Sequence, residues 1–303
     1  DAWYLRTLDV PESWCASCVL VRFDGVYMDC DVLLNGHIVC THHYGYTAFD
    51  VDLTSRLLVG RNTLAVHIRH QSPNSRWYSG AGIYRDVTLH VLPKRHIPLD
   101  GVYVTTTHEL ESWTMTIDTE LCGVKDNGVL THVLLDGDVP VCDVTVEAAG
   151  DHANAVMQVL SPKLWSPDAP NVYTLQTMLG NQVIRQNVGF RDLTFTTDRG
   201  LLVNGAPVKL HGVCLHHDLG CLGSAFHEKA MRRQLRAMRQ MGVNALRTSH
   251  NPPAKQVMDL CDELGIFVVD EAFDMWLRAK TPFDYARFFP TDMPSDVAAW
   301  VRR

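Results

Sequence analysis

The chain has 303 residues, of which 46% are hydrophobic and 20% are charged, and its formal net charge is −7. These values are typical of a globular protein with two or three domains and exclude a disordered or fibrous chain. The acidic balance and a pI near 6.1 argue against a nucleic-acid surface. No apolar run reaches the roughly 18 residues that span a bilayer. We therefore expect neither nucleic acid nor a membrane as a partner.

The nine cysteines are scattered along the chain. Cys15 and Cys18 have the spacing of half a zinc site, but no second Cys or His pair follows at finger spacing. Cys30 and Cys40 flank a turn signal and could face each other across a hairpin. We favour reduced structural thiols in a reducing, cytoplasmic compartment. Because the chain opens at Asp1 inside a strand-like run and has no initiator Met, we also expect a truncated N-terminus.

Residues 1–93 have the pattern of a β-domain. The strongest signal is Asn35-Gly36, which separates apolar runs at 31–34 and 37–39 and is typical of a two-residue hairpin. No helical period competes with the strand pattern. We therefore predict a β-sandwich for this segment.

A second set of short strands follows a segment with a proline at each end, residues 93–98, which we interpret as a linker. Strands are predicted at 113–117 and 131–135, and Asp136-Gly137 and Gly180-Asn181 mark turns. About a hundred residues of such strands indicate an immunoglobulin-like sandwich for residues 97–195. The Cys-Trp-Cys spacing of antibody domains is missing from the sequence.

From residue 196 onward, predicted strands alternate with helices, which indicates βαβ units and a parallel sheet. Residues 227–241 combine an apolar helical stripe with a basic one, which we assign to a solvated outer face rather than to an anion site. Short strands are predicted at 243–247 and 266–269, with a helix between them that ends at Gly265. Residues 196–303 are therefore predicted to form the first strands of a (β/α) barrel.

Polar side chains follow three successive strands of this predicted barrel, in the runs His216-His217-Asp218, Arg247-Thr248-Ser249-His250 and Asp270-Glu271. Because the carboxyl ends of barrel strands line the active site, we predict a functional site there. Arg247 suits the orientation of a carboxylate. His216 and His250 suit hydrogen bonds to sugar hydroxyls or stabilisation of developing charge. Glu271 could be part of the site, or its carboxylate could serve only to hold neighbouring side chains in place.

A metal centre is the alternative for this site. Adjacent residues of an extended segment point in opposite directions, so His216 and His217 cannot chelate one ion. The sequence has no His-x-x-x-His or His-Glu-x-x-His spacing, no phosphate loop, no dinucleotide fingerprint and no nucleophile elbow. We expect no catalytic zinc.

Aromatic, charged and glycine residues are concentrated in the loop 74–86. Such a loop suits sugar binding, because aromatic rings stack on the C–H faces of sugars while a carboxylate accepts hydrogen bonds from hydroxyls. In the other interpretation, the loop is a tight connection in which Trp77 packs between sandwich and barrel. The sequence alone favours neither interpretation.

The most specific motif of the chain is Asn-Ala-Leu-Arg-Thr-Ser-His-Asn-Pro-Pro at 244–253, supported by the runs 77–86 and 270–276 and by Leu34-Asn35-Gly36. Together these segments resemble glycoside hydrolase family 2, the family of β-galactosidases, β-glucuronidases and β-mannosidases. The domain order of that family is a jelly-roll sugar-binding domain, an immunoglobulin-like sandwich and a TIM barrel. The resemblance therefore implies these three domains, at residues 1–93, 97–195 and 196–303.

The resemblance also implies a retaining reaction with two glutamates, an acid/base and a nucleophile about 5–5.5 Å apart. We expect both glutamates beyond Arg303, so that this chain contains no catalytic residue of its own. Carried over by position, Arg247 would orient the nucleophile, and His216 and His250 would contact the sugar or the transition state. The remaining residues of the expected substrate-binding set are Asp86, which would bind a sugar hydroxyl, Asn251 and Glu271.

The chain departs from the magnesium-dependent members of the family, in which a Glu and a His follow the Asp-Glu-Ala stretch. Asp274 and Trp276 take those places here, so we expect no obligatory metal and no cofactor. Residues 248–253 favour β-galactosidase-like specificity, with a carbohydrate as the partner and a homo-oligomer compatible with the resemblance. β-Glucuronidase or β-mannosidase specificity is one alternative. A non-catalytic sugar-binding or scaffold protein is another, although an incomplete barrel exposes unpaired strand edges and favours truncation.

Overall fold

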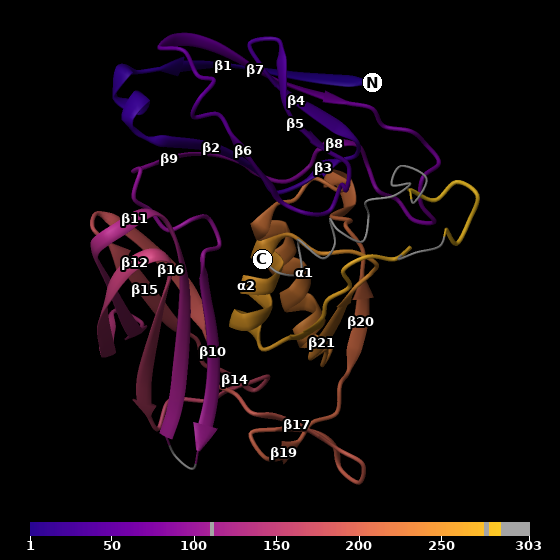
Figure 1. The fold of residues 1–303 in the computed structure, drawn as a ribbon. Coiled ribbons are helices and arrows are strands. Elements are labelled where there is room, and N and C mark those ends of the chain that lie inside the picture. Colours follow the sequence, from indigo (N-terminus) through magenta and orange to yellow (C-terminus); the bar gives the residue numbers. More distant parts are fainter. Residues whose placement is uncertain (110–111, 276–278, 286–303) are drawn as a thin grey trace.

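The computed structural model describes residues 1–109, 112–275 and 279–285, which form three units that follow one another along the chain (Figure 1). Two β-sandwiches are followed by a parallel sheet with two helices. This arrangement confirms the predicted fold class. Within the described residues, no helix combines the length and the apolar character needed to cross a membrane.

The first unit is a sandwich of two antiparallel sheets, with the strand orders β1-β7-β4-β5 and β6-β2-β9. Buried residues alternate with partly exposed ones along β2 and β4, and the buried set, which includes Phe23 and Val32, packs between the sheets. The elements of this unit are β1 Ala2–Val10, the 3-10 helix η1 Glu12–Ala16, β2 Cys18–Phe23, β3 Val26–Tyr27, β4 Cys30–Leu34, β5 His37–His42, β6 Phe49–Asp52, β7 Gly60–Ile68, β8 Gly82–Ile83 and β9 Val87–Leu92.

The predicted hairpin at Asn35-Gly36 is confirmed and connects β4 with β5. Both residues have positive φ, 50° for Asn35 and 85° for Gly36, as a type I′ turn requires. The Asn35 side chain fixes the turn, since its Oδ1 accepts a hydrogen bond from the Thr63 backbone N–H at 2.9 Å. The turn therefore also joins the hairpin to the end of β7.

The second unit is an antiparallel sandwich in which β10, β11, β15 and β16 are neighbours in that order and β12 also pairs with β11. The predicted strands at 113–117 and 131–135 are two parts of one long strand, β11. Its register against β12 shifts near Glu120, Val124 and Gly128. Both parts contribute to one apolar cluster, through Ile117 and Leu134 among others, and the stretch between them contributes Leu121 and Leu130 to a second cluster. The elements are β10 Val102–Glu109, β11 Ser112–Asp136, β12 Val139–Leu160, β13 Trp165–Ser166, β14 Ala169–Pro170, β15 Tyr173–Leu179 and β16 Gln182–Val188.

The third unit begins with a small antiparallel sheet and continues as a parallel sheet in the order β20-β21-β22. Helices α1 and α2 pack on this sheet through a cluster that includes Leu235, Leu246, Val257 and Cys261. The elements are β17 Leu193–Thr196, β18 Gly200–Val203, β19 Ala206–Pro207, β20 Gly212–Leu215, the 3-10 helix η2 Gly220–Leu222, α1 Glu228–Gln240, β21 Ala245–Thr248, α2 Lys255–Leu264 and β22 Phe267–Val269.

Specific contacts join the three units. Arg22 of the first sandwich forms an ion pair with Asp100, at the start of the second, over 2.7 Å. The indole N–H of Trp165 donates a hydrogen bond to the backbone oxygen of Asp262 in α2 at 2.8 Å. At the end of α2, Gly265 lies so close to the β13–β14 turn that a Cβ atom there would be 2.2 Å from the Pro167 carbonyl oxygen. The second sandwich is thus fixed against both of its neighbours.

Candidate functional site

The predicted site lies where the carboxyl ends of β20, β21 and β22 face the first sandwich (Figure 1). In a parallel sheet these ends share one edge, so the residues that follow the three strands are brought together. The first sandwich reaches the same edge through the loop between β7 and β8 and through the turn after β8. The candidate site is therefore built from two domains.

Arg247, His250 and Glu271 form the centre of the site. Arg247 Nε donates to Glu271 Oε1 at 2.6 Å, and His250 Nδ1 lies 3.2 Å from Glu271 Oε2 and 3.4 Å from Arg247 Nη2. The Arg247 side chain is still 43% exposed. The structure thus brings together three of the predicted residues and leaves part of the guanidinium accessible to a ligand.

The neighbours of this centre hold the strand ends in place. Thr248 Oγ1 donates to Asp270 Oδ1 at 2.9 Å and accepts from the backbone N–H of Glu271 at 3.0 Å. Burial raises the pKa of Asp270 despite its hydrogen bond with Thr248. Arg247 Nη1 also donates to the Cys214 sulfur at 3.5 Å, and this contact, followed by that of Ser249, lowers the pKa of the thiol.

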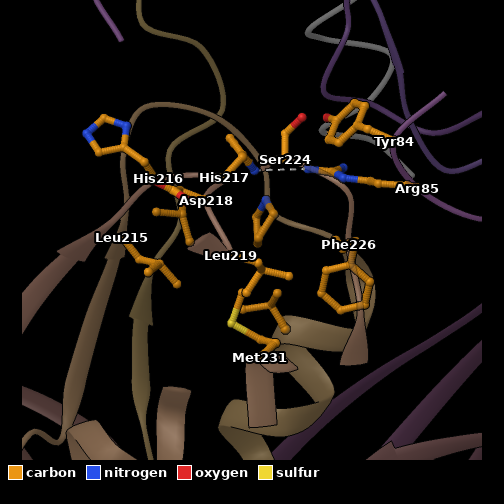
Figure 2. A pocket seen from close by; sticks show the side chains of 14 residues that line it. Tyr84, Arg85, Leu215, His216, His217, Asp218, Leu219, Ser224, Phe226 and Met231 are labelled. Carbon is orange, nitrogen blue, oxygen red and sulfur yellow. Dashed lines mark hydrogen bonds between the residues drawn. The ribbon is translucent and has the colours of Figure 1, made fainter. Parts of the chain in front are cut away.

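The two adjacent histidines, His216 and His217, point in opposite directions, as predicted for an extended segment (Figure 2). The His216 ring lies 5.3 Å from that of His250, so His216 belongs to the site. Its pKa is lowered by burial and, to a smaller extent, by His250 and Arg247. His217 instead faces Arg85 at 3.5 Å, and burial, followed by the charge of Arg85, holds its pKa well below the ordinary value. His217 is therefore neutral and structural.

Asn251 is placed in the interior rather than on the ligand side. It is fully buried, and its amide group lies 3.4 Å from His217 Nε2 and 3.5 Å from the Tyr44 hydroxyl. The pocket beside these residues, shown in Figure 2, has a volume of about 30 Å³. A cavity of this size does not accommodate a sugar ring.

Asp86 is not brought to the other predicted residues. Its carboxylate accepts a hydrogen bond at 3.2 Å from Gln256 in α2. Asp86 is exposed, whereas its neighbour Arg85 is buried. Arg85 donates to the Pro252 carbonyl oxygen at 2.8 Å and to that of Tyr46 at 2.9 Å. Of these two neighbours, Arg85 is therefore the one enclosed between the first sandwich and the barrel segment.

The loop between β7 and β8 contributes two residues that were not in the predicted set, Arg76 and Trp77. The Trp77 ring lies 4.9 Å from His250 and 6.2 Å from His216, and its indole N–H donates to the Tyr46 hydroxyl at 3.0 Å. Trp77 therefore packs between sandwich and barrel, as in the second interpretation of this loop, and it borders the site; sugar binding by the loop stays a prediction. The cluster of aromatic and charged residues was the available signal.

Asp274 is the partner of Arg76. Its buried carboxylate accepts hydrogen bonds from Arg76 Nη2 at 2.8 Å and from Lys280 Nζ at 2.7 Å. Burial alone would raise the pKa of Asp274, but the hydrogen bonds with Lys280 and Arg76 bring it below the ordinary value. Both oxygens already have cationic partners, so Asp274 does not fit the role of a magnesium ligand.

Trp276, the second position at which the sequence departs from the magnesium-dependent members of the family, lies outside the described residues. Across the part of the chain that the structure describes, no group of three or more His, Cys, Asp or Glu side chains has an arrangement that could hold a metal ion. The site therefore presents hydrogen-bonding, cationic and aromatic groups, which is the chemistry of carbohydrate recognition.

The three units define a multidomain protein in which the first sandwich contributes residues to the candidate site at the carboxyl ends of the barrel strands. Models of glycosyl hydrolases family 2 match the sugar-binding domain at residues 1–93, the central domain at 96–191 and the TIM barrel domain at 195–287. The chain belongs to glycosyl hydrolases family 2. This confirms the resemblance seen in the sequence.

Relatives of the chain are named for two different activities. The β-galactosidase BoGH2A of Bacteroides ovatus is 38% identical over 95% of this chain, and a putative β-glucuronidase of Formosa agariphila is 34% identical over 99%. The chain spans 36% and 30% of the lengths of these two relatives.

Solved structures of glycosidases are also similar to the chain. A β-glycosidase from Bacteroides vulgatus superposes with a TM-score of 0.92 at 34% identity, and the alignment covers 99% of this chain and 40% of that one. A β-glucuronidase from Bacteroides uniformis gives a TM-score of 0.83 at 30% identity, covering 94% and 37%.

Proposed function

We propose that the complete protein hydrolyses terminal β-glycosidic bonds with retention of configuration, and that its preference is β-galactosidase-like. The observation that carries the proposal is the half-exposed guanidinium of Arg247 at the carboxyl end of β21, held by Glu271 and next to His250. This chain would supply the residues that bind the sugar and orient a carboxylate. The two catalytic glutamates are expected in sequence beyond Arg303.

Each residue of the centre has a role that its geometry supports. The rigid fork of Arg247 already binds one carboxylate, that of Glu271, and retains N–H groups that can orient a second, the nucleophile. His250 and His216 line the same edge and can donate hydrogen bonds to the sugar or to charge that develops in the transition state. The apolar face beside them belongs to Trp77, whose ring can stack on the C–H groups of a pyranose.

The preference for galactosides is supported by the name of the Bacteroides ovatus relative and by the match of residues 248–253 to that group. A second specificity, for β-glucuronides, is favoured by the Formosa agariphila relative and by the Bacteroides uniformis structure. Both specificities use the same reaction, but the two sugars differ in the configuration of the C4 hydroxyl and in the group at C6, which is a hydroxymethyl in a galactoside and a carboxylate in a glucuronide.

The test is to express the protein from the whole reading frame that includes this chain and to assay it with nitrophenyl β-galactoside, β-glucuronide, β-mannoside and β-glucoside. We expect kcat/KM to be highest for the β-galactoside and the product to keep the β-configuration by NMR. A higher kcat/KM for the β-glucuronide would replace the galactosidase preference with the second specificity. The absence of hydrolysis of all four glycosides would contradict the proposal.

A further inference from the structure

An ion pair crosses the boundary between the first sandwich and the barrel at the edge of the candidate site. It joins Arg76, in the loop between β7 and β8, to Asp274, which follows β22, and the two residues are 198 positions apart in the sequence. The Asp274 side chain is only 5% exposed and that of Arg76 is 33% exposed. Lys280 binds the other carboxylate oxygen of Asp274. A buried carboxylate is thus held by one cation from each domain.

This ion pair is adjacent to His250. Asp274 Oδ1 lies 3.8 Å from His250 Nδ1, the nitrogen that also faces Glu271 Oε2 at 3.2 Å. The ring of Trp77, the residue after Arg76, lies 4.9 Å from the His250 ring. Two consecutive residues of the sandwich therefore constrain His250, Trp77 by packing and Arg76 through the carboxylate that it holds.

On the basis of the glycosidase function proposed above, we propose that Arg76 is a positioning residue for His250 and acts through Asp274. A buried carboxylate that loses a cationic partner must find another donor or bear a large desolvation cost. His250 Nδ1 is the near donor, and a shift of the imidazole toward Asp274 would weaken its hydrogen bond with Glu271. Arg76 prevents this shift, so the sugar-binding domain fixes the geometry of the barrel site.

The first test replaces Arg76 with glutamine in the complete enzyme. Because His250 contacts the sugar or the transition state in the proposed function, its displacement should lower kcat by ~10- to ~100-fold with a smaller change in KM. Arg76→Lys keeps the positive charge and should retain kcat within about threefold. An unchanged kcat in Arg76→Gln would overturn the proposal.

The second test separates positioning from general stability. In a His250→Ala background, Arg76→Gln should lower kcat by less than about twofold, since a residue that acts through His250 has no effect when His250 is absent. An equal loss in both backgrounds would show that Arg76 acts independently of His250 and would overturn the proposal.

The matched control is Arg22→Gln, which removes another cross-domain ion pair, with Asp100, at a distance from the site. It should lower the unfolding midpoint and leave kcat unchanged. Arg76→Met repeats the main test if Arg76→Gln does not fold, because it also removes the cation and leaves the Asp274 carboxylate in place, and it should show the same loss of kcat and the same dependence on His250.

The positioning role and the glycosidase function can fail separately. A wild-type enzyme that hydrolyses glycosides, combined with an Arg76→Gln variant of normal kcat, would remove only the positioning role. A wild-type enzyme that hydrolyses no glycoside would remove the proposed function, and the positioning role with it.

Discussion

Arg247 shows how the chemistry of one side chain suits its place in the fold. Its guanidinium donates to Glu271 through Nε and to the Cys214 sulfur through Nη1, and its Nη2 lies 3.4 Å from His250 Nδ1. A lysine ammonium is a compact point charge and cannot make these contacts at the same time. The proposed orientation of a second carboxylate therefore depends on arginine at this position.

Replacement of Arg247 with methionine tests this role at the residue scale. Methionine keeps the length and apolar stem of the side chain but has no donor, so kcat/KM for the preferred glycoside should fall by ~10²- to ~10³-fold, the range found when a single oriented donor is removed. Arg236→Met is the matched control, because Arg236 is exposed on α1. It should keep normal kcat/KM. A loss below about threefold in Arg247→Met would contradict the assigned role.

Geometry decides which of the predicted site residues lie together, while their roles stay predictions. His216, Arg247, His250 and Glu271 lie together because they follow strands whose carboxyl ends meet at one edge. Asp86 lies apart from them, because a motif does not tell which of two consecutive residues faces inward, and Arg85 is the buried one here. The Arg76–Asp274 pair could not be predicted, since its partners are 198 residues apart and belong to different domains.

Among the elements, the long strand β11 has the least expected property, a buried histidine. His132 has no exposed surface, its Nδ1 lies 3.0 Å from Thr177 Oγ1, and its Nε2 has no partner among the described residues. Burial lowers the pKa of His132 to about 4. The interior of the second sandwich therefore contains a neutral imidazole.

This histidine makes the stability of the second sandwich depend on pH. The unfolded chain binds a proton at His132 below about pH 6.5, whereas the folded chain does not until about pH 4, so stability is complete above pH 6.5 and falls between pH 6.5 and 4. The slope for one such group is at most about 1.4 kcal/mol per pH unit.

The pH dependence can be measured as urea unfolding at pH 7, 6 and 5. A double variant, His132→Leu with Thr177→Val, removes both polar partners. It should reduce the dependence of the free energy of unfolding on pH by up to about 1.4 kcal/mol per pH unit. Other buried histidines contribute equally in both proteins, so the difference isolates His132. Identical slopes in wild type and variant would contradict the assigned pKa.

Elements defined by local chemistry were predictable, and elements defined by distant partners were not. Asn35-Gly36 predicts its hairpin because both residues tolerate positive φ. The length of β11 could not be predicted, because its bend at Val124 and Gly128 depends on pairing with β12 and on the two apolar clusters that these strands bury. No single segment of the sequence contains that information.

At the scale of the whole molecule, Gly265 controls the contact between the barrel and the second sandwich. It ends α2 with a φ of 70°, and its Cα lies against the Pro167 carbonyl. Gly242, which follows α1, has a φ of 87°, but a Cβ atom added there would have no neighbouring atom within 4 Å among the described residues. Both glycines have a left-handed conformation, but only Gly265 lies against another domain.

Alanine at each glycine separates the two effects. Gly242→Ala should cost about 1 kcal/mol in the free energy of unfolding, the conformational penalty alone. Gly265→Ala should cost about 1–3 kcal/mol more, because the new methyl group must displace backbone of the β13–β14 turn. Urea unfolding of both variants measures the difference. Equal losses would show that the domain contact can adjust without cost.

The ion pair between Arg76 and Asp274 also bears on how genes of this family can recombine. A crossover that brings a loop at residues 71–82 from one parent and a segment at 270–285 from another would separate a cation from its matching carboxylate. Such a chimera would keep every strand and helix and still lose the arrangement around His250. Where the parents differ at either position, the two segments should therefore be exchanged together, and a library of swapped domains should retain active members chiefly where both come from the same parent.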